Sequence, residues 1–551
     1  MAISNHLPQG GTASMLGYER GERMRERTDR TIVIAGWPRL AALVGLALAA
    51  LAIMALAACG DDGDGGGGSG SDGIKTGGSL TVTLVSENNT LDPPVTLGTA
   101  DTLITQQMYD NLLMIQPDLS MKPELATSWE PNEELSSWTF QLREGVKFHN
   151  GKDFKAEDVV FSFNRLLDPV IDSPARPTFE VIEHMEIIDD YTIRFDLISP
   201  SAFFPEVLSI YQARITPSNI DVETLTLGGV GTGPFILEEY LPGQRTVLSK
   251  NPDYWDEGKP YLDEVVFQLI PDPSTRAEAL KSGDVDVIYQ LEPPTAPSIE
   301  AHPDTVVLET ASSSHIGLDL GNWEAPFDNK LVRQALQAAT DREAIRQAAL
   351  FGRGSIGYDH PIAPNDPMFS SECLPPEYDP ELAKELLAEA GYPDGLEVTL
   401  YTGNVGPGML EQSVALKESA APAGITVNLV QRPEDQFWAN TWLIENFTVV
   451  YWFGRTPDQA LSIQYMSDST WNAPRYLNDE LDALIVKARG QVDDAERAET
   501  YKQIQCILVE DVPRLVTAFQ PVLYGERDDV RNVNPHPLGW LILNEAWLDR
   551  E

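Results

Sequence analysis

Residues 135–167 constrain the fold of this chain more than any other stretch. They read LSSWTFQLREGVKFHNGKDFKAEDVVFSFNRLL. Apolar and polar residues alternate over 138–142, which is the pattern of a half-buried strand. Asn150-Gly151 favours a tight turn, because both residues accept a positive φ readily. Beyond Ala156 the apolar residues recur at helical spacing, at Val159, Val160, Phe163, Leu166 and Leu167. The stretch therefore predicts a strand, a turn and an amphipathic helix.

The whole chain has the length and pattern of a multi-lobed α/β protein. At 551 residues it exceeds what one hydrophobic core usually holds, so two or more lobes are expected. A strand over 396–401, a helix over 409–423 and a strand over 425–430 form a βαβ unit, which predicts a parallel pair of strands. Residues 447–453 (FTVVYWF) predict a buried strand.

The wording of the opening stretch resembles a known family. WTFQLREGVKFHNGK followed by AEDVVFSFNR closely resembles the signature of the family 5 extracytoplasmic solute-binding proteins of ABC importers, which bind oligopeptides, dipeptides or nickel. NPDYW at 251–255 and VRQALQAATDREAI at 332–345 resemble the same family. The resemblance extends in patches over 79–551. It implies a two-lobed, type II periplasmic-binding-protein-like fold, with a subdomain inserted in the first lobe and a ligand cleft between the lobes.

The resemblance also implies a division of the chain. We expect the following segments: a signal peptide with a lipobox (1–58), a lipidated cysteine and flexible linker (59–78), the first part of lobe I (79–122), its inserted subdomain (123–228), the second part of lobe I (229–313), lobe II (314–518) and a C-terminal return to lobe I (519–551).

The N-terminal region has the parts of an export signal. Six arginines precede an uncharged apolar run over 40–58, and Leu56-Ala57-Ala58-Cys59-Gly60 resembles a bacterial lipobox. We expect cleavage before Cys59 and lipidation of its sulfur, which would anchor the protein to the outer face of the cytoplasmic membrane or in the periplasm. The alternative is an uncleaved membrane anchor. The Gly/Ser/Asp-rich stretch 61–78 would serve as a flexible tether between the lipid anchor and the globular body.

Charge and motifs exclude several functional classes. The net charge of −45 would repel phosphate backbones, so nucleic-acid binding is not expected. The chain contains no P-loop, GxSxG, HExxH or CxxC pattern. The GxGxxG at 352–357 follows a predicted helix and does not open one, which favours a connection over a dinucleotide site. We predict a binding protein without enzymatic activity, cofactor or metal site. An exported hydrolase, a sensory receptor domain, and haem or nickel binding through His315 or His360 remain alternatives.

Two cysteines follow Cys59 in the chain. Cys373 and Cys506 would form an even pair in an exported protein, so a disulfide between them is one interpretation. Two separate buried thiols are the other.

The predicted ligand site lies where the strand 447–453 ends. Ligand crevices form at the carboxyl ends of strands in open α/β sheets. By resemblance, Trp452 matches a tryptophan of the oligopeptide binders, but Arg455 stands where those proteins have the aspartate that pairs with a peptide ammonium group. Asp458 could substitute for that aspartate. An arginine favours a carboxylate or phosphate instead. The predicted ligand-binding residues are Glu87, Asn88, Trp323, Trp438, Trp442, Trp452, Phe453, Arg455 and Asp458, with core packing as the alternative for each aromatic.

The sequence leaves the ligand class open. The resemblance favours an oligopeptide, and the aromatic and arginine content of the predicted site favours an oligosaccharide or an acidic small solute. The expected partners are that solute, an ABC permease with its ATPase and, through the lipid, a membrane. We expect a monomer whose lobes close over the ligand by hinge motion.

Overall fold

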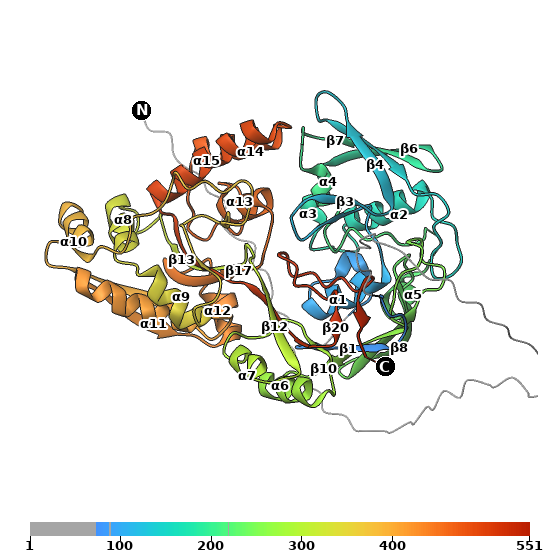
Figure 1. Ribbon diagram of the computed structural model, residues 1–551. Helices are drawn as coiled ribbons and strands as arrows, with labels where there is room; N and C mark the ends of the chain where they lie inside the picture. The colour runs from blue at the N-terminus through green and yellow to red at the C-terminus, as the bar shows by residue number, and fades with distance from the viewer. Residues whose placement is uncertain (1–72, 87–89, 219, 551) are drawn as a thin grey trace, which may run out of the picture. The chain divides into compact units, whose positions relative to one another are not determined.

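The structure is a computed structural model that describes residues 73–86, 90–218 and 220–550. Cys59, the predicted signal peptide and the predicted site residues Glu87 and Asn88 lie outside the described residues. Strands and helices are interspersed along the described chain, as the α/β pattern of the sequence predicts (Figure 1). Most of the strands lie in three larger sheets. Among these residues, no helix has the length and apolar character needed to cross a membrane.

The largest sheet has seven strands and defines what we call lobe I. The two strands that pair with β1 from either side, β10 and β11, both run parallel to it. The sheet order is β12 (Thr305–Thr310), β19 (Val522–Arg527), β11 (Val287–Ile288), β1 (Ser79–Leu84), β10 (Glu264–Leu269), β9 (Arg245–Lys250) and β8 (Phe235–Leu241). The helices packed on these strands are α1 (Thr99–Met108), α5 (Val222–Gly228), α6 (Pro273–Ser282) and α7 (Ala296–Glu300).

The second sheet has six strands and defines lobe II. Its order is β14 (Ser355–Ile356), β18 (Arg514–Phe519), β13 (His315–Leu320), β17 (Phe447–Trp452), β15 (Leu396–Thr402) and β16 (Ile425–Gln431). The predicted βαβ unit is confirmed, because β15 and β16 pair in parallel and α11 lies between them in the chain. Lobe II contains the helices α8 (Lys330–Ala338), α9 (Arg342–Leu350), α10 (Pro380–Glu389), α11 (Met409–Ala420), α12 (Glu434–Asn440), α13 (Pro457–Tyr465), α14 (Asp479–Arg489) and α15 (Asp494–Asp511).

A four-stranded antiparallel sheet forms the third body, which we call the subdomain. Its order is β4 (Ala126–Pro131), β5 (Ser137–Leu142), β7 (Thr192–Leu197) and β6 (Ile182–Asp189), and it packs with α2 (Ala156–Leu167), α3 (Arg176–Phe179) and α4 (Phe204–Val207). Its chain lies in sequence between β1 and β8 of lobe I. Short pairs complete the fold: β2 (Leu113–Ile115) with β3 (Met121–Pro123), and β20 (Val530–Arg531) with β21 (Trp547–Leu548). Two 3₁₀ turns lie at Pro93–Val95 and Ala421–Ala423.

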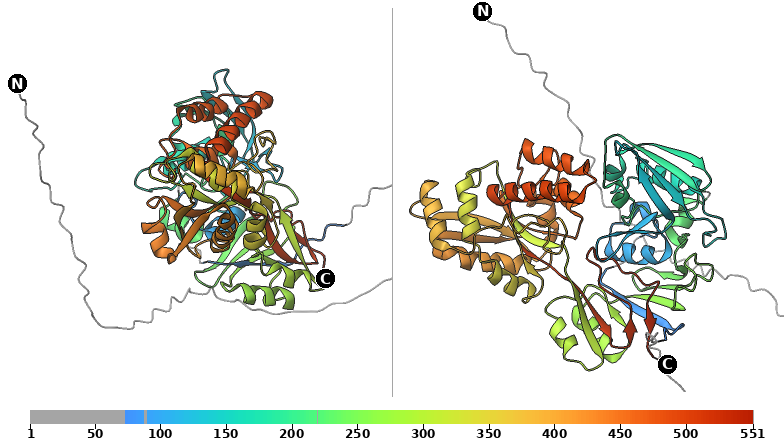
Figure 2. Two further views of the ribbon diagram at one scale, coloured as in Figure 1. Left: turned by 90° about the vertical axis from the view of Figure 1, so that its left-hand side faces the viewer. Right: turned by 45° about the horizontal axis from the view of Figure 1, so that its top comes forward.

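The chain passes between the two large sheets twice. The first passage is 311–314, between β12 and β13, and the second is 520–521, between β18 and β19. The two passages touch each other, because the Gln520 amide donates to the Ser314 carbonyl at 2.7 Å. Figure 2 shows the red segment of β18 and β19 running from one sheet to the other, and β19 pairs with β12. Any movement of one lobe against the other must therefore pass through these two short segments.

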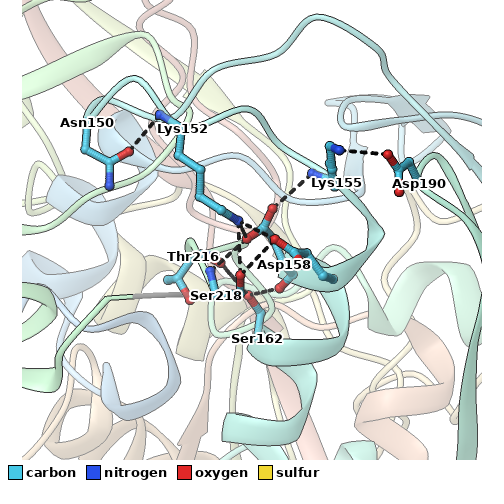
Figure 3. Close-up of polar contacts among 9 residues, drawn as sticks. Asn150, Lys152, Lys155, Asp158, Ser162, Asp190, Thr216 and Ser218 are labelled. Atoms are coloured by element: carbon cyan, nitrogen blue, oxygen red, sulfur yellow. Dashed lines mark hydrogen bonds and ion pairs between the residues drawn. The ribbon is translucent and has the colours of Figure 1, made fainter.

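The signature stretch forms the strand and helix that its pattern predicts, as β5 and α2. Asp158, with no exposed side-chain surface, holds the start of α2 (Figure 3). Its carboxylate accepts from the Lys155 amide at 2.9 Å and from the Ser218 amide at 2.7 Å, and it pairs with the Lys152 ammonium group. One buried carboxylate thus joins the turn, the helix start and the segment at 216–218. In this protein, these residues of the signature have a structural role.

The ends of several elements differ from the sequence pattern or depend on distant contacts. The helix predicted over 409–423 is α11, which ends at Ala420 and is followed by the 3₁₀ turn Ala421–Ala423. The strand predicted over 447–453 is β17, which ends at Trp452. The helix α1 ends at Met108, whose carbonyl accepts from the Gly233 amide, and the chain then continues in extended conformation. The helix α8 is capped by Asn329, whose side chain accepts from the Leu331 amide.

Candidate functional site

The carboxyl end of β17 brings two arginines to the face of one tryptophan. Trp452 is 5% exposed, and the guanidinium carbons of Arg455 and Arg514 lie 5.3 Å and 5.4 Å from its ring centroid. β17 is a central strand between β13 and β15, so both of its edges are paired and its position is fixed. Cation–π contacts at this distance are favourable and orient both guanidinium groups.

Arg514 is committed to the protein itself. It is fully buried, forms an ion pair with Asp319 on β13 and donates to Gln464 at 2.5 Å. The indole of Trp442 also donates to Asp319, at 3.2 Å. Burial raises the pKa of the Asp319 carboxyl, and the Arg514 charge opposes that rise. The positive charge of Arg514 is therefore balanced by Asp319 within the protein, and Arg514 contributes to the site by packing on the Trp452 ring.

Arg455 is held by its backbone, while its charge is left without a partner of opposite sign. Its amide donates to the Ser313 hydroxyl at 2.9 Å, and that hydroxyl donates to the Arg455 carbonyl at 2.7 Å. Its guanidinium donates only to the Phe453 carbonyl, at 3.2 Å, and pairs with no carboxylate among the described residues. Burial lowers its pKa, and the nearby Tyr211 phenol acts in the opposite direction. A half-buried, unpaired guanidinium is a natural anchor for an anion.

Four of the five aromatic residues predicted for the site, all except Trp323, belong to one connected cluster that also contains Tyr451 and Trp471. The ring centroids of neighbouring members lie 5.3–6.2 Å apart, in the order Phe453, Tyr451, Trp438, Trp442 and then Trp452 and Trp471. Phe453 is 57% exposed and Trp471 is 44% exposed, whereas Trp452 is enclosed. The two exposed rings are the ones available for stacking on a ligand.

Two predicted site residues have other contacts. Trp323 lies under the guanidinium of Arg475, 4.3 Å from its ring centroid, and makes no ring contact with the cluster in the described part of the chain. Asp458 on α13 pairs with Arg489 at 2.7 Å, so its charge is already balanced. Burial raises the pKa of Asp458 and the Arg489 charge opposes that rise. Asp458 is therefore poorly suited to replace the aspartate that resemblance expects at position 455.

Near Asp458, the subdomain touches lobe II. The Ala202 amide donates to the Arg489 carbonyl at 2.6 Å, and the Phe203 ring packs with the apolar side chains of α13, α14 and α15. The Arg497 guanidinium lies 5.3 Å from the Phe203 ring. This contact joins segments on the two sides of the site.

A small pocket in lobe I opens beside the subdomain. Its lining includes Tyr109, Glu124, Tyr211, Arg214 and Trp540. Arg214 is 4% exposed, and its Nε and Nη1 atoms have no hydrogen-bond partner among the described residues. Burial lowers the pKa of Arg214 to about 9, and burial raises the pKa of Glu124 to about 8, with the Asp110 charge adding to the latter rise.

His315 and the glycine-rich motif have local roles. His315 is buried, with Nδ1 2.9 Å from the Ser313 carbonyl and Nε2 3.3 Å from Gln464, and burial lowers its pKa to about 3. No group of three metal-ligating side chains occurs within 73–86, 90–218 and 220–550. The glycines of 352–357 lie in the connection from α9 through β14, where a Cβ at Gly354 would meet the Phe519 carbonyl at 2.2 Å.

Cys373 and Cys506 are joined in the structure. Their Cα atoms lie 4.9 Å apart, and 133 positions separate them in sequence. The bond fastens the connection before α10 to the long helix α15 of lobe II.

Comparison with known proteins identifies the family. Residues 120–474 match the family described as "Bacterial extracellular solute-binding proteins, family 5 Middle". Heme-binding protein A of Haemophilus influenzae is 33% identical over 456 residues, which is 76% of this chain and 83% of that protein. This chain belongs to the family 5 solute-binding proteins. Its fold is accordingly the two-lobed, type II periplasmic binding-protein fold, as predicted.

Other relatives of this solute-binding protein carry peptide names. Di/tripeptide-binding protein 2 of Pseudomonas aeruginosa is 30% identical and aligns with 80% of this chain and 89% of its own. The periplasmic binding protein DppA of Helicobacter pylori, solved with the peptide STSA, is 27% identical, covers 86% of this chain and 99% of its own, and has a TM-score of 0.73. The binding protein AgaA of A. tumefaciens R10, solved with agropinic acid, is 28% identical with the same coverage and TM-score.

Sequence reasoning missed three residues around the site of this solute-binding protein. Arg514 begins the apolar strand β18, and a charged residue opening a buried strand could have indicated a buried pair. Tyr211 and Arg214 lie in an irregular segment after α4, where no periodic pattern shows burial. Only the folded chain brings Tyr211 near Arg455 and Arg214 into the pocket of lobe I.

Proposed function

We propose that this protein captures a short peptide or a peptide-like acidic solute outside the cytoplasm and presents it to an ABC permease with its ATPase. The family consists of extracellular solute-binding proteins, and several relatives are named for peptides or glutathione. The observation that carries the proposal is Arg455, three residues beyond the end of β17, whose guanidinium lies beside Trp452 and pairs with no carboxylate of the described residues.

The chemistry of Arg455 favours the carboxylate of the ligand over its ammonium group. A guanidinium donates two parallel hydrogen bonds to the two oxygens of a carboxylate, and its charge repels an ammonium group. The exposed rings of Phe453 and Trp471 would pack against the body of the solute. The ligand residues proposed from the sequence are thus retained where they cluster: Trp438, Trp442, Trp452, Phe453 and Arg455.

Capture would use lobe closure. The two passages between the sheets are only a few residues long and hydrogen-bonded to each other, which suits a hinge. A solute that contacts both lobes binds the closed form better and so shifts the population toward it. Under this proposal the protein is not an enzyme. It acts as a monomer, and a lipid on Cys59 anchors it at the membrane.

An acidic small solute that is not a peptide is the second candidate. Arg455 favours it, and the relative solved with agropinic acid provides a precedent for such a ligand in a protein of this family. Both candidates share a carboxylate for Arg455 and differ in the body of the molecule.

The test is identification of the bound solute followed by titration. The purified protein is denatured and the released small molecules are identified by mass spectrometry. Isothermal titration then measures di- and tripeptides, glutathione and non-peptide carboxylic acids. Tight binding of a peptide or peptide-like acid, with compaction in small-angle scattering, is the expected result. Binding of neither class, or chemical conversion of the solute, would refute the proposal.

Anchoring has a separate test. Expression in a bacterial host should give a membrane-associated protein that takes up labelled fatty acid. Cys59→Ser should abolish the label and release the protein from the membrane. Retention of label in C59S would contradict lipidation at this residue.

A further inference from the structure

The pocket of lobe I contains a buried cation without hydrogen-bond partners on two of its nitrogens. Arg214 lines the pocket and is 4% exposed, and its Nε and Nη1 atoms make no hydrogen bond to any described residue. An unsatisfied buried charged donor is costly, because the group has left water without regaining its hydrogen bonds. A ligand oxygen that accepts from these atoms would remove that cost.

The acidic groups around the pocket are engaged with other donors. Asp110 accepts from Thr232 and from the Trp255 indole, each at 2.8 Å, and from the Tyr254 hydroxyl at 3.3 Å. Glu124 accepts from the Asn111 amide at 3.0 Å. No ion pair joins Arg214 to either carboxylate within the described residues. The Arg214 guanidinium therefore has carboxyl groups nearby but no oxygen at bonding distance.

One close approach links the segment after β17 to the chain that lines the pocket. A Cβ placed on Gly454, next to Arg455, would meet the Pro537 carbonyl at 2.9 Å. Trp540, three residues further along that segment, lines the pocket with Arg214. Tyr211 also lines the pocket, and its phenol is close enough to influence both Arg214 and Arg455. The Tyr211 phenol thus acts on both guanidinium groups.

We propose that the lobe I pocket is a second anion subsite, in which Arg214 binds one carboxylate of the solute while Arg455 binds another. The solute is then a dicarboxylate, such as an acidic peptide with a free carboxyl terminus. This deepens the proposed function and rests on it, because it assigns the ligand class of the same site. A ligand bridging the two arginines would also join lobe I to lobe II.

The experiment pairs changes in the ligand with changes in the protein. The probes are Glu-Ala-Ala, Ala-Ala-Glu and glutathione, which each carry two carboxylates. Each is compared with analogues that lack one of them: the Gln peptide or the carboxyl-terminal amide. Dissociation constants are measured by isothermal titration for the wild type, Arg214→Gln, Arg214→Lys, Arg455→Gln and Arg245→Gln. Arg245 is an exposed arginine at the first position of β9, and its replacement controls for the loss of one positive charge.

We expect the best dicarboxylate to bind the wild type about 10–100-fold more tightly than either analogue, the range of one charge-assisted bond. R214Q should lose that preference for one of the two carboxylates, and R455Q should lose it for the other. R214K should keep part of it, and R245Q should change nothing. Circular dichroism and thermal unfolding identify any variant that fails to fold, and R214K then supplies the comparison.

The outcomes separate the two proposals. If no peptide or acid binds the wild type, the proposed function fails. If solutes bind the wild type but the dicarboxylates have no advantage, the second subsite is refuted while the proposed function stands. The second subsite is equally refuted if a folded R214Q keeps full preference for both carboxylates, and Arg214 is then purely structural.

Discussion

Replacing Asp158 by Asn tests the structural role of the family signature. In the wild type, the buried carboxylate of Asp158 accepts from two backbone amides, those of Lys155 and Ser218, and pairs with the Lys152 ammonium group (Figure 3). An asparagine has one oxygen and one NH₂ group, so it cannot accept at both positions and carries no charge.

The magnitude follows from these contacts. A charge-assisted hydrogen bond contributes about 1.5–3 kcal/mol, and a buried amide left without an acceptor costs about 1–3 kcal/mol. D158N should therefore destabilise the start of α2 by about 3–5 kcal/mol. Asp190→Asn is the matched control in the same view: Asp190 is 65% exposed and pairs with Lys155 at the surface, at 2.7 Å, so the loss of its charge should change almost nothing.

Hydrogen exchange with mass spectrometry is the suitable assay, because a chain with several lobes need not unfold in one step. Peptides covering 150–167 should lose about two to four orders of magnitude of protection in D158N, since each 1.4 kcal/mol is tenfold. Peptides of β15 and β16, in lobe II, should be unaffected. Equal protection in D158N and D190N would refute the assignment of Asp158 as the buried link between turn, helix and 216–218.

Three further predictions concern the site and the stability of lobe II. Arg455→Asp should weaken binding of an anionic solute by at least about 100-fold in titration calorimetry, because attraction becomes repulsion; an unchanged dissociation constant removes Arg455 from the site. Cys373→Ala/Cys506→Ala should lower the unfolding free energy by about 2–5 kcal/mol, since the bond closes a loop of 133 positions, and equal urea midpoints would contradict this. The affinity for a dicarboxylate should fall as pH rises through about 8. Burial raises the pKa of Glu124 to about 8, so this carboxyl gains its negative charge over that range, facing Asp110, Arg214 and Lys122. Arg214, with a pKa of about 9, begins to lose its positive charge and so weakens binding in the same direction. Glu124→Gln should move the fall toward pH 9, and an identical pH profile in E124Q would count against this role.

Local pattern predicted most elements of the fold. The alternation at 138–142 and the helical stripe from Val159 correspond to β5 and α2, because each side chain there meets the same core. Element ends were less accessible. The end of α1 depends on the Gly233 amide, which is more than 120 residues away in sequence, and no local signal contains that contact.

In the candidate site, too, local sequence pattern predicted some residues, and contacts between distant segments determine the others. The residues at the end of β17 could be predicted, since the apolar strand and its polar continuation are contiguous in sequence. The partner of Asp458 could not, because Arg489 comes from a different helix. Arg214 could not be predicted either. Its proposed role depends on the lack of hydrogen-bond partners for two of its nitrogens among the described residues, and no sequence pattern indicates such a lack.

The position of Ser313 links solute binding to lobe movement. Its hydroxyl is hydrogen-bonded to both the amide and the carbonyl of Arg455, and it lies within the passage from β12 to β13. The neighbouring Ser314 carbonyl accepts from Gln520 of the other passage. A solute that binds Arg455 therefore acts directly on the two segments about which the lobes would turn.

Ser313→Ala removes this link while leaving the guanidinium in place. It should preserve the preference for an acidic solute but weaken affinity by roughly 3–30-fold, the range of one or two neutral hydrogen bonds. It should also reduce ligand-induced compaction in small-angle scattering. If S313A compacts as fully as the wild type at saturating solute, the hinge and the arginine are independent.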